Sequence, residues 1–542
     1  MDHLMYNQEY FKLDSKLSDG NNGGRNGRSS RNNLFILYAV CNSVLNGEEP
    51  IDINLYDIEK CFDTLWNEDV INSLYELGLR NDILNLIYLE NRQASISVKS
   101  AHGDTERSNI KDTILQGTVW GPVQCFAHLD EIGKLAYFNE HILYKYKGVT
   151  IPPLQQVDDI LTISKCGDSN SIILNNIINS QIERKKLKFN QKKCVKISVG
   201  NISCECHIKM KVHNKNVINS HEELYLGNIV NSSCNFTDII NQRISKGYGI
   251  VAQIKAILKD VPFGPNRVKS GLILREAKFI NAVLFAAETW HNTSINEIKR
   301  LEKVDECLLR SILFDCNPKT PIEFLHLETS TFKLRHIISI RRLMFLREIL
   351  SKETNEVLYK VFDAQSKDPS KGDFVKLCQE DCKNIKLEIS NEEIIKLSKS
   401  EYKQIVKLKM AEYCIQQLKE AQSNHRKIKD IHYNNEFQRY LCDPSLNFIQ
   451  RRTIFQFRAK IVPNIKANFK GTFKDDLTCP LKCNNKHIDS QENLLSCDKL
   501  TKFYDGNNAK HEDFFGTVDQ QKKAAILFQN LLIQRNELLK YL

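Results

Sequence analysis

The sequence of 542 residues contains no apolar run long enough to cross a bilayer. Its first residues, "MDHLMYNQEYFKLDSK", also lack the basic start and apolar core of a secretion signal. The 17 cysteines are odd in number, and most of them stand singly in apolar segments. Such cysteines pack as small hydrophobic residues in a reducing compartment. We therefore expect a soluble intracellular protein without a membrane partner.

The remaining composition is that of an ordinary globular protein, with 42% hydrophobic and 26% charged residues. The length predicts several domains. The net charge of +10 is moderate, but Lys and Arg gather in stretches such as "ERKKLKFNQKKCVK" and "RRTIFQFRAK". These stretches fit two interpretations: basic surfaces that attract phosphate, or solvated helix faces.

The order of patterns along the chain predicts its organisation. Residues 1–30 end in "SDGNNGGRNGRSS", a composition typical of a flexible N-terminal segment. Helical and strand-like segments alternate in residues 31–236, which indicates an α+β fold. Helical spacing dominates residues 237–350 and much of 351–474. We find no internal repeat.

Three carboxylates are the candidate site. Asp57 directly follows the alternating apolar run "IDINLY", and Asp158 and Asp159 stand at the bend between two strand-like segments. If these elements pair in one sheet, the carboxylates converge, and their repulsion requires a cation. Mg²⁺ prefers oxygen ligands, and two such ions about 4 Å apart support nucleotidyl transfer. The alternative is a surface turn, which Asp residues favour.

Two further aspartates are not assigned to this site. Asp52 alternates out of phase with the apolar residues of its strand, so we expect it to be solvated. Asp63 lies near a helix N-terminus, where the helix dipole favours a carboxylate.

Several motifs stand in the order found in a known family. "LYDIEKCFDTLW" resembles the first catalytic motif of reverse transcriptases, and "LQGTVWGP" resembles the Gln-Gly…Pro motif that follows it. "QQVDDILTIS" resembles their metal-binding Asp-Asp hairpin, while "LKFNQKKCVKISVG" and "EELYLGNIV" resemble the next two motifs. Upstream, "GRSSRNNLFIL" resembles the segment before the first motif. Over residues 27–244 the chain thus resembles the reverse transcriptase of LINE-type, jockey-like non-LTR retrotransposons.

The resemblance implies a right-hand polymerase architecture. It places a palm with partial fingers in residues 31–236, a helical thumb in 237–350 and a helical extension in 351–474. A Cys/His segment at 475–500 and a C-terminal helical tail at 501–542 would follow. Family members carry a long fingers segment and an endonuclease domain upstream, for which too few residues precede Gly27. We therefore expect an N-terminally truncated piece of a larger polyprotein, or a decayed copy.

The resemblance also implies roles for individual residues. Asp57 and Asp158 would ligate two Mg²⁺ ions, and Asp159 would support the same cluster. The residues implied to contact the nucleotide are Phe62 (excluding a 2′-hydroxyl), Gln116 and Gly117 (flanking nucleotide and template) and Lys193 (near the phosphates). The residues implied to grip the primer 3′ end are Tyr225, Leu226 and Gly227.

The implied function is that of an RNA-directed DNA polymerase, a nucleotidyltransferase that extends a primer 3′-hydroxyl. Its partners would be an RNA template, a DNA primer, deoxynucleoside triphosphates and other retroelement-encoded proteins, in the nucleus and cytoplasm. Two alternatives stay open. One is a catalytically inactive, retroelement-derived nucleic-acid-binding protein, and the other is a helical interaction protein whose Asp pair is incidental.

A second candidate metal site lies near the C-terminus. "CPLKCNNKHIDSQENLLSC" offers Cys479, Cys483, His487 and Cys497, a ligand set that suits tetrahedral zinc. It resembles the C-terminal Cys/His segment of the same elements, which usually place a His where Asn493 stands. The segment therefore predicts either a structural zinc ion or reduced, metal-free cysteines.

Overall fold

The structure is a computed structural model of the whole chain. It describes residues 13, 15–109, 113–114, 118, 120–200, 210–212, 215–261, 264–291, 293–313, 320–422, 436–463, 465–469, 477–483, 488–504 and 509–540. The described residues form a mixture of helices and sheet, in agreement with the predicted α+β pattern. Among the described helices, none has the length and apolarity needed to span a membrane.

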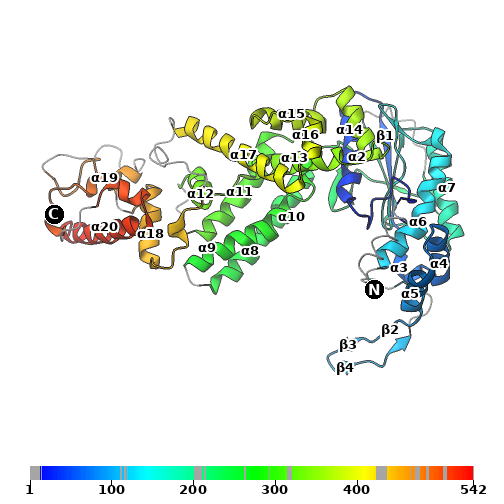
Figure 1. Cartoon of the computed structure of the whole chain (residues 1–542), viewed down its shortest axis with the longest axis horizontal. Coiled ribbons are helices and arrows are strands. Elements are labelled where there is room, and N and C mark those ends of the chain that lie inside the picture. Colours follow the sequence, from blue (N-terminus) through cyan, green and yellow to red (C-terminus); the bar gives the residue numbers. More distant parts are fainter. Residues whose placement is uncertain are drawn as a thin grey trace.

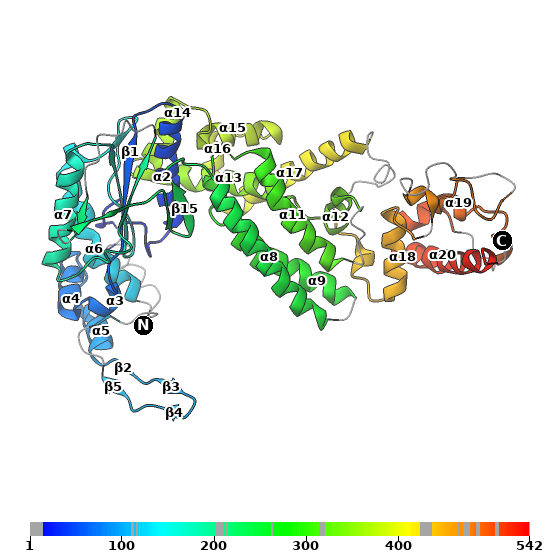
Figure 2. The same cartoon turned by 180° about the vertical axis from the view of Figure 1, so that it is seen from behind.

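The molecule is elongated (Figure 1). A part containing the main sheet lies at one end, a set of helices forms the middle, and a smaller C-terminal part lies at the other end. The view from behind gives the same order (Figure 2). The helices of the sheet-containing part are α2 (Ser30–Leu45), α3 (Cys61–Thr64), α4 (Asn67–Glu76), α5 (Asn81–Arg92), α6 (Gly121–Phe138) and α7 (Asn170–Arg184).

The main sheet has five strands in the order β13-β10-β1-β9-β8. Its central strand β1 is antiparallel to both β9 and β10, whereas β10 and β13 are parallel. The strands are β1 (Ile51–Tyr56), β8 (Leu154–Gln156), β9 (Asp159–Lys165), β10 (Val195–Val199) and β13 (Ile218–Asn219). The described chain also contains short hairpins: β2 (Ser95–Ile96) with β5 (Ser108–Asn109), β3 (Lys99–Ser100) with β4 (Gly103–Asp104), β6 (Lys145–Tyr146) with β7 (Val149–Thr150), β11 (Lys211–Val212) with β12 (Lys215–Asn216), and β14 (Glu222–Tyr225) with β15 (Asn228–Asn231).

The alternation along β1 separates the two faces of this sheet. Ile51, Ile53 and Leu55 are buried in the larger apolar core, which also includes α2. The polar side chains between them, Asp52 and Asn54, lie on the opposite face because successive strand residues point to opposite sides.

The expectation that Asp52 is solvated is wrong. Its side chain is only 1% exposed, and it forms an ion pair of 2.8 Å with Lys196 and accepts a hydrogen bond from Ser198. Asp52 lines a cavity that it shares with Ser171 and Asn175 of α7. The second face of the sheet is therefore polar and nevertheless covered by a helix, an arrangement that strand alternation alone does not reveal.

The structure also differs from the prediction of a flexible segment, at residues 18–28. Asn21, Asn22 and Arg25 in this stretch are buried, and Asn21 forms a parallel β-bridge with Gln155 of β8. Glycine and asparagine here permit close backbone packing against a strand that lies more than a hundred residues further along the chain.

Helices form the middle of the molecule, where helical spacing predicts them. The helices of residues 237–422 are α8 (Thr237–Lys259), α9 (Pro265–Leu274), a π-helical stretch (Arg275–Ile280), α10 (Asn281–Val283), α11 (Ile295–Ile312), α12 (Ile322–Thr329), α13 (Leu334–Leu350), α14 (Val357–Lys367), α15 (Phe374–Asn384), α16 (Asn391–Lys396) and α17 (Lys399–Gln422). Of these, α14 packs against α2 and β7 of the sheet-containing part. Helix α11 begins with a capping box between Ser294 and Glu297, which satisfies two otherwise unpaired backbone N–H groups.

The C-terminal part is built on α18 (Phe448–Arg458), α19 (Gln491–Leu494) and α20 (Val518–Leu538). A buried ion pair joins it to the middle helices: Arg458 of α18 contacts Glu328 of α12 at 2.7 Å. The same carboxylate accepts a hydrogen bond from Tyr440.

Candidate functional site

The three predicted aspartates meet at one end of the main sheet. Strands β8 and β9 form a hairpin in which Gln156 is paired with Asp159, so Val157 and Asp158 make up its two-residue loop. The ladder between β1 and β9 ends at the pair Tyr56–Ile160. One further step in this register places Asp57 opposite Asp159, where Cβ atoms of facing residues are about 5 Å apart.

The loop that presents Asp158 has an unusual backbone. Val157 has a φ angle of 61°, in the left-handed region that β-branched residues rarely adopt. Such a conformation costs about 1–3 kcal/mol and persists only where the surrounding structure holds it in place. Strained residues of this kind concentrate at ligand-binding and catalytic sites, which makes the hairpin a functional candidate on its own geometry.

The electrostatics of the cluster reflect its crowding. Burial, together with the charges of Asp158 and Asp57, raises the pKa of Asp159 to about 6. Burial and the charge of Asp57 also raise the pKa of Asp158, while Lys193 opposes the change. Close carboxylates with raised pKa values have the environment expected of ligands to a hard cation.

Lys193 provides the positive charge beside the cluster. Its ammonium group lies 3.2 Å from an Asp57 carboxylate oxygen, and this hydrogen bond raises the pKa of Lys193. The backbone N–H of Asn190 donates to the Asp57 carbonyl at 2.8 Å, and that of Lys193 donates to the Asn190 carbonyl. A turn at Asn190 therefore holds Lys193 against Asp57, while the Lys193 side chain remains 65% exposed.

The carboxylates are spaced more widely than the ligands of a single tight metal centre. Among the described residues, the one group of three metal-binding side chains whose ligand atoms all lie within 4.8 Å consists of cysteines, not of these aspartates. A two-ion site distributes its ligands around two cations about 4 Å apart, so it does not require all three carboxylates to converge on one point.

Of the residues predicted to contact the nucleotide, the structure describes Phe62 and Lys193. Phe62 lies in α3 directly after the Asp57 loop, half-buried against the smaller apolar core. Gln116 and Gly117 lie outside the described residues. Helix α6 begins at Gly121 shortly after them.

The predicted primer-gripping residues lie in the hairpin of β14 and β15. Leu226 and Gly227 are its two loop residues, with φ angles of 47° and 76°. Tyr225 is buried, and burial together with the nearby Asp159 charge raises its pKa. The Tyr225 hydroxyl thus lies near Asp159, but the Tyr225 ring packs inside the protein. Arg243 of α8 anchors the loop by donating to the Gly227 carbonyl at 2.8 Å.

The second candidate site gathers three of its four predicted ligands. The sulfur atoms of Cys479, Cys483 and Cys497 all lie within 4.8 Å of one another. His487 lies outside the described residues. The Asn493 side chain donates to the Ile488 carbonyl at 3.0 Å, so it stabilises the adjoining turn.

Burial and the proximity of these thiols both oppose their ionisation. Burial and the neighbouring sulfurs raise the pKa of Cys479 to about 12, and burial raises that of Cys497. A tetrahedral zinc ion with Zn–S bonds of about 2.3 Å would separate two sulfurs by roughly 3.8 Å. The sulfur spacing therefore fits zinc.

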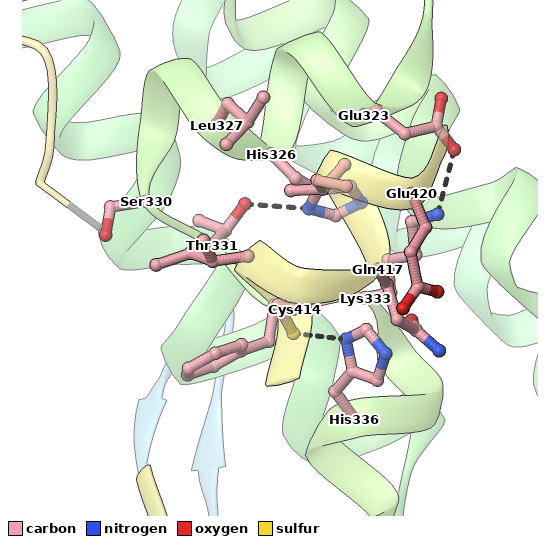
Figure 3. A pocket seen from close by; sticks show the side chains of 13 residues that line it. Glu323, His326, Leu327, Ser330, Thr331, Lys333, His336, Cys414, Gln417 and Glu420 are labelled. Carbon is pink, nitrogen blue, oxygen red and sulfur yellow. Dashed lines mark hydrogen bonds and ion pairs between the residues drawn. The ribbon is translucent and has the colours of Figure 1, made fainter. Parts of the chain in front are cut away.

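A cavity of about 320 Å³ lies among the middle helices (Figure 3), and neither the predicted aspartates nor the cysteine cluster line it. His326 and His336 point into it, and His336 is hydrogen-bonded to Cys414 of α17 at 3.1 Å. An ion pair of 2.9 Å between Lys333 and Glu323 lies at its side. Because its charged lining is mixed in sign, this cavity does not resemble a nucleotide site.

Comparisons with known proteins give limited information. No protein family model matches the chain, and no curated protein matches it. Two solved telomerases bound to a TWJ fragment of telomeric RNA are similar to parts of it. The one from Candida tropicalis has a TM-score of 0.34 and 11% identity over 72% of this chain and 55% of that chain. The one from Candida albicans has a TM-score of 0.31 and 13% identity over 66% and 57%.

An apo telomerase structure from Candida tropicalis gives a similar result, with a TM-score of 0.34 and 11% identity over 69% of this chain and 60% of that chain. The chain thus spans little more than half the length of these proteins. At such identities and TM-scores, the similarities define neither a family nor an activity for it.

Proposed function

We propose that the chain is a nucleotidyltransferase of the reverse transcriptase type, an RNA-directed DNA polymerase from a LINE-type non-LTR retrotransposon. The observation that carries the proposal is the meeting of Asp57, Asp158 and Asp159 with Lys193 at one end of a sheet, in the order of the family motifs. In this proposal residues 31–236 form the palm with partial fingers, 237–350 the thumb and 351–474 an extension.

The carboxylates suit divalent cations because burial and mutual repulsion oppose their ionisation in the absence of positive charge. Asp57 and Asp158 would hold two Mg²⁺ ions, with Asp159 supporting the cluster. When bound, such ions lower the barrier to attack by a primer 3′-hydroxyl and stabilise the charge on the leaving pyrophosphate.

The other residues of the site would orient substrates. Lys193 is exposed enough to turn from Asp57 towards a triphosphate and to donate a proton to the leaving group. Phe62 would lie under the sugar and exclude a 2′-hydroxyl. The Leu226–Gly227 loop, which Arg243 anchors through the Gly227 carbonyl, would support the primer end through its backbone.

The test is primer extension on an RNA template with deoxynucleoside triphosphates and Mg²⁺. We expect the natural chain to extend the primer. In Asp158→Asn the extension rate should fall by a factor of at least about 1,000, because the substitution removes a carboxylate that would both hold and position the metal ions. Asp63→Asn serves as the control because Asp63 is an exposed carboxylate of the same region. Equal activity of Asp158→Asn and the natural chain would contradict the proposal.

We further propose a structural zinc ion at Cys479, Cys483 and Cys497, with His487 as the fourth ligand. The clustered sulfurs support it. A structural zinc ion contributes directly to folding, so it would stabilise the C-terminal part rather than act in the reaction.

A further inference from the structure

We infer that the Asn- and Gly-rich stretch of residues 18–25, together with Asn33 of helix α2, positions the Asp158 hairpin, with Gly23 and Asn33 as the positioning residues. The inference rests on the proposed function of that hairpin as a metal-binding element. Composition predicts a flexible segment for residues 18–25 of this element.

The stretch covers the outer edge of the sheet. Strand β8 is the last strand, and its outward backbone groups are paired with this stretch. The N–H of Asn22 donates to the Gln155 carbonyl at 2.9 Å, and the N–H of Gln155 donates to the Gly20 carbonyl at 2.9 Å. The hairpin that carries Asp158 is therefore held from β9 on one side and from residues 20–22 on the other.

Asn33 of helix α2 reinforces the same point of the hairpin. Its side-chain amide is fully buried and donates to the Gln155 carbonyl at 3.1 Å. Its oxygen accepts a hydrogen bond of 2.6 Å from the Asn22 side chain. The Gln155 carbonyl thus receives two hydrogen bonds, which fixes strand β8 only three residues before Asp158.

Gly23 lies directly against the hairpin loop. A Cβ atom at this position would be 2.3 Å from the backbone nitrogen of Val157 and 3.1 Å from the carbonyl carbon of Gln156. These are backbone atoms, so any larger residue would have to displace the loop itself. The residue that Gly23 touches, Val157, is also the one in the left-handed conformation.

The stretch is in turn fixed to the body of the protein. Asp130 of α6 accepts hydrogen bonds from the backbone N–H of Ser18 and from the Asn21 side chain. Arg25 donates to the carbonyls of Ser18 and Asn21 at 2.7 and 2.9 Å. Because these contacts are buried, the stretch is fixed firmly enough to keep the strained loop in its conformation.

The geometry connects this support to the carboxylates. Asp57 directly follows β1 and is hydrogen-bonded to Asn190 and Lys193, whereas Asp158 immediately follows the residue that Gly23 contacts. A shift of the loop would therefore change the separation between Asp57 and Asp158. The stretch sets the relative position of two ligands that come from different strands.

The test measures binding of Mn²⁺ to the full chain by electron paramagnetic resonance, with primer extension as a second readout. For Gly23→Ala and for Asn33→Ala, we expect Mn²⁺ binding at the Asp158-dependent site to weaken about 10- to 100-fold, as for other residues that orient metal ligands. Gly249→Ala is the matched control, because a Cβ atom there meets nothing within 4 Å and its Mn²⁺ affinity should not change.

The outcomes separate the inference from the proposed function. If the natural chain never extends primers but Gly23→Ala and Asn33→Ala weaken Mn²⁺ binding, the positioning role stands and the proposed polymerase function is wrong. Natural Mn²⁺ affinity in a folded Gly23→Ala or Asn33→Ala variant, with only a lower Tm, would reduce the stretch to a structural role and overturn the inference. If Gly23→Ala does not fold, Asn33→Ala decides, because it removes hydrogen bonds without adding atoms. If Asp158→Asn abolishes no Mn²⁺ binding, both the positioning inference and the proposed function are wrong.

Discussion

At the scale of single residues, the charged groups of the site and the buried histidines elsewhere obey the same rule. Burial shifts the pKa of Asp158, Asp159 and the buried histidines towards the less charged form, and a nearby partner of opposite charge opposes the shift. At the carboxylates Lys193 is the compensating charge in the structure. Among the described residues His291 has no such partner: its ring packs against Tyr38 and Phe236, and its buried Nε2 has no hydrogen bond to any described residue.

We predict that His291 makes the protein sensitive to acid. Burial lowers its pKa from the ordinary 6.5 to about 3. Between these values the unfolded chain binds a proton that the folded chain does not, so the free energy of unfolding falls with decreasing pH by up to about 1.4 kcal/mol per pH unit. Above pH 6.5 the His291 ring is neutral in both the folded and the unfolded chain, so it causes no loss of stability there.

The measurement is denaturant unfolding of the natural chain and His291→Phe between pH 7 and pH 5. The variant keeps an aromatic ring and should lose stability less steeply as the pH falls. His102→Phe, at an exposed hairpin, is the control and should follow the natural profile. Parallel profiles for all three chains would exclude this role of His291.

The three carboxylates can be predicted from the sequence, but the residues that hold the Asp158 hairpin in place cannot. Asp57, Asp158 and Asp159 stand at recognisable strand ends, but local signals also fit a surface turn, and the ordered resemblance to reverse transcriptase motifs is what favours their convergence. Gly23 and Asn33 carry no such signal, because their role depends on contacts with residues 153–157 that are distant in sequence. The left-handed conformation of Val157 is equally hidden, since valine gives no indication of it.

At the scale of elements, the prediction that fails is the solvent exposure of polar side chains that lie between a strand and a helix. The alternation in β1 correctly separates two faces, but it cannot tell whether the polar face meets water or a helix. Helix α7 covers that face, and the ion pair between Asp52 and Lys196 is the consequence. The helices of residues 237–350 were easier to predict, because 3.6-residue periodicity is a local property of the sequence.

The connection between α12 and α18 leads to a prediction at this scale. Arg458 and Glu328 are 3% and 1% exposed, and each has further hydrogen bonds. Removal of one partner of such a buried pair leaves an uncompensated charge and costs about 3–5 kcal/mol. We therefore expect Glu328→Gln to lower the free energy of unfolding by this amount in thermal or denaturant melts.

Glu412→Gln provides the comparison for that experiment. Glu412 pairs with Lys409 at 3.0 Å on the outside of α17, and exposed pairs contribute about 0–1 kcal/mol. Equal effects of the two substitutions would show that burial does not govern the strength of the α12–α18 connection.

At the scale of the whole molecule, the two candidate metal sites are far apart. The main sheet lies at one end of the molecule, and the C-terminal part with α19 and α20 lies at the other (Figure 1). A change at one site should therefore leave the other end intact.

We predict that Cys497→Ser lowers the zinc content of the purified chain and destabilises only its C-terminal part. Zinc is measured by mass spectrometry, and local unfolding by hydrogen exchange of residues 477–540 compared with β1 and β9. Cys307→Ser, a cysteine outside the cluster, should leave both quantities unchanged. A natural chain that contains no zinc after purification in its presence would contradict the prediction.

The covering of β8 by residues 20–22 has one more consequence. The outer strand of an open sheet offers unpaired N–H and C=O groups that can recruit a strand from another copy of the protein. Here those groups are already occupied by the chain's own glycine and asparagine backbone. The same short stretch thus covers the β8 edge of the sheet, so the residues that keep this edge from pairing with another copy are also those that hold the Asp158 hairpin.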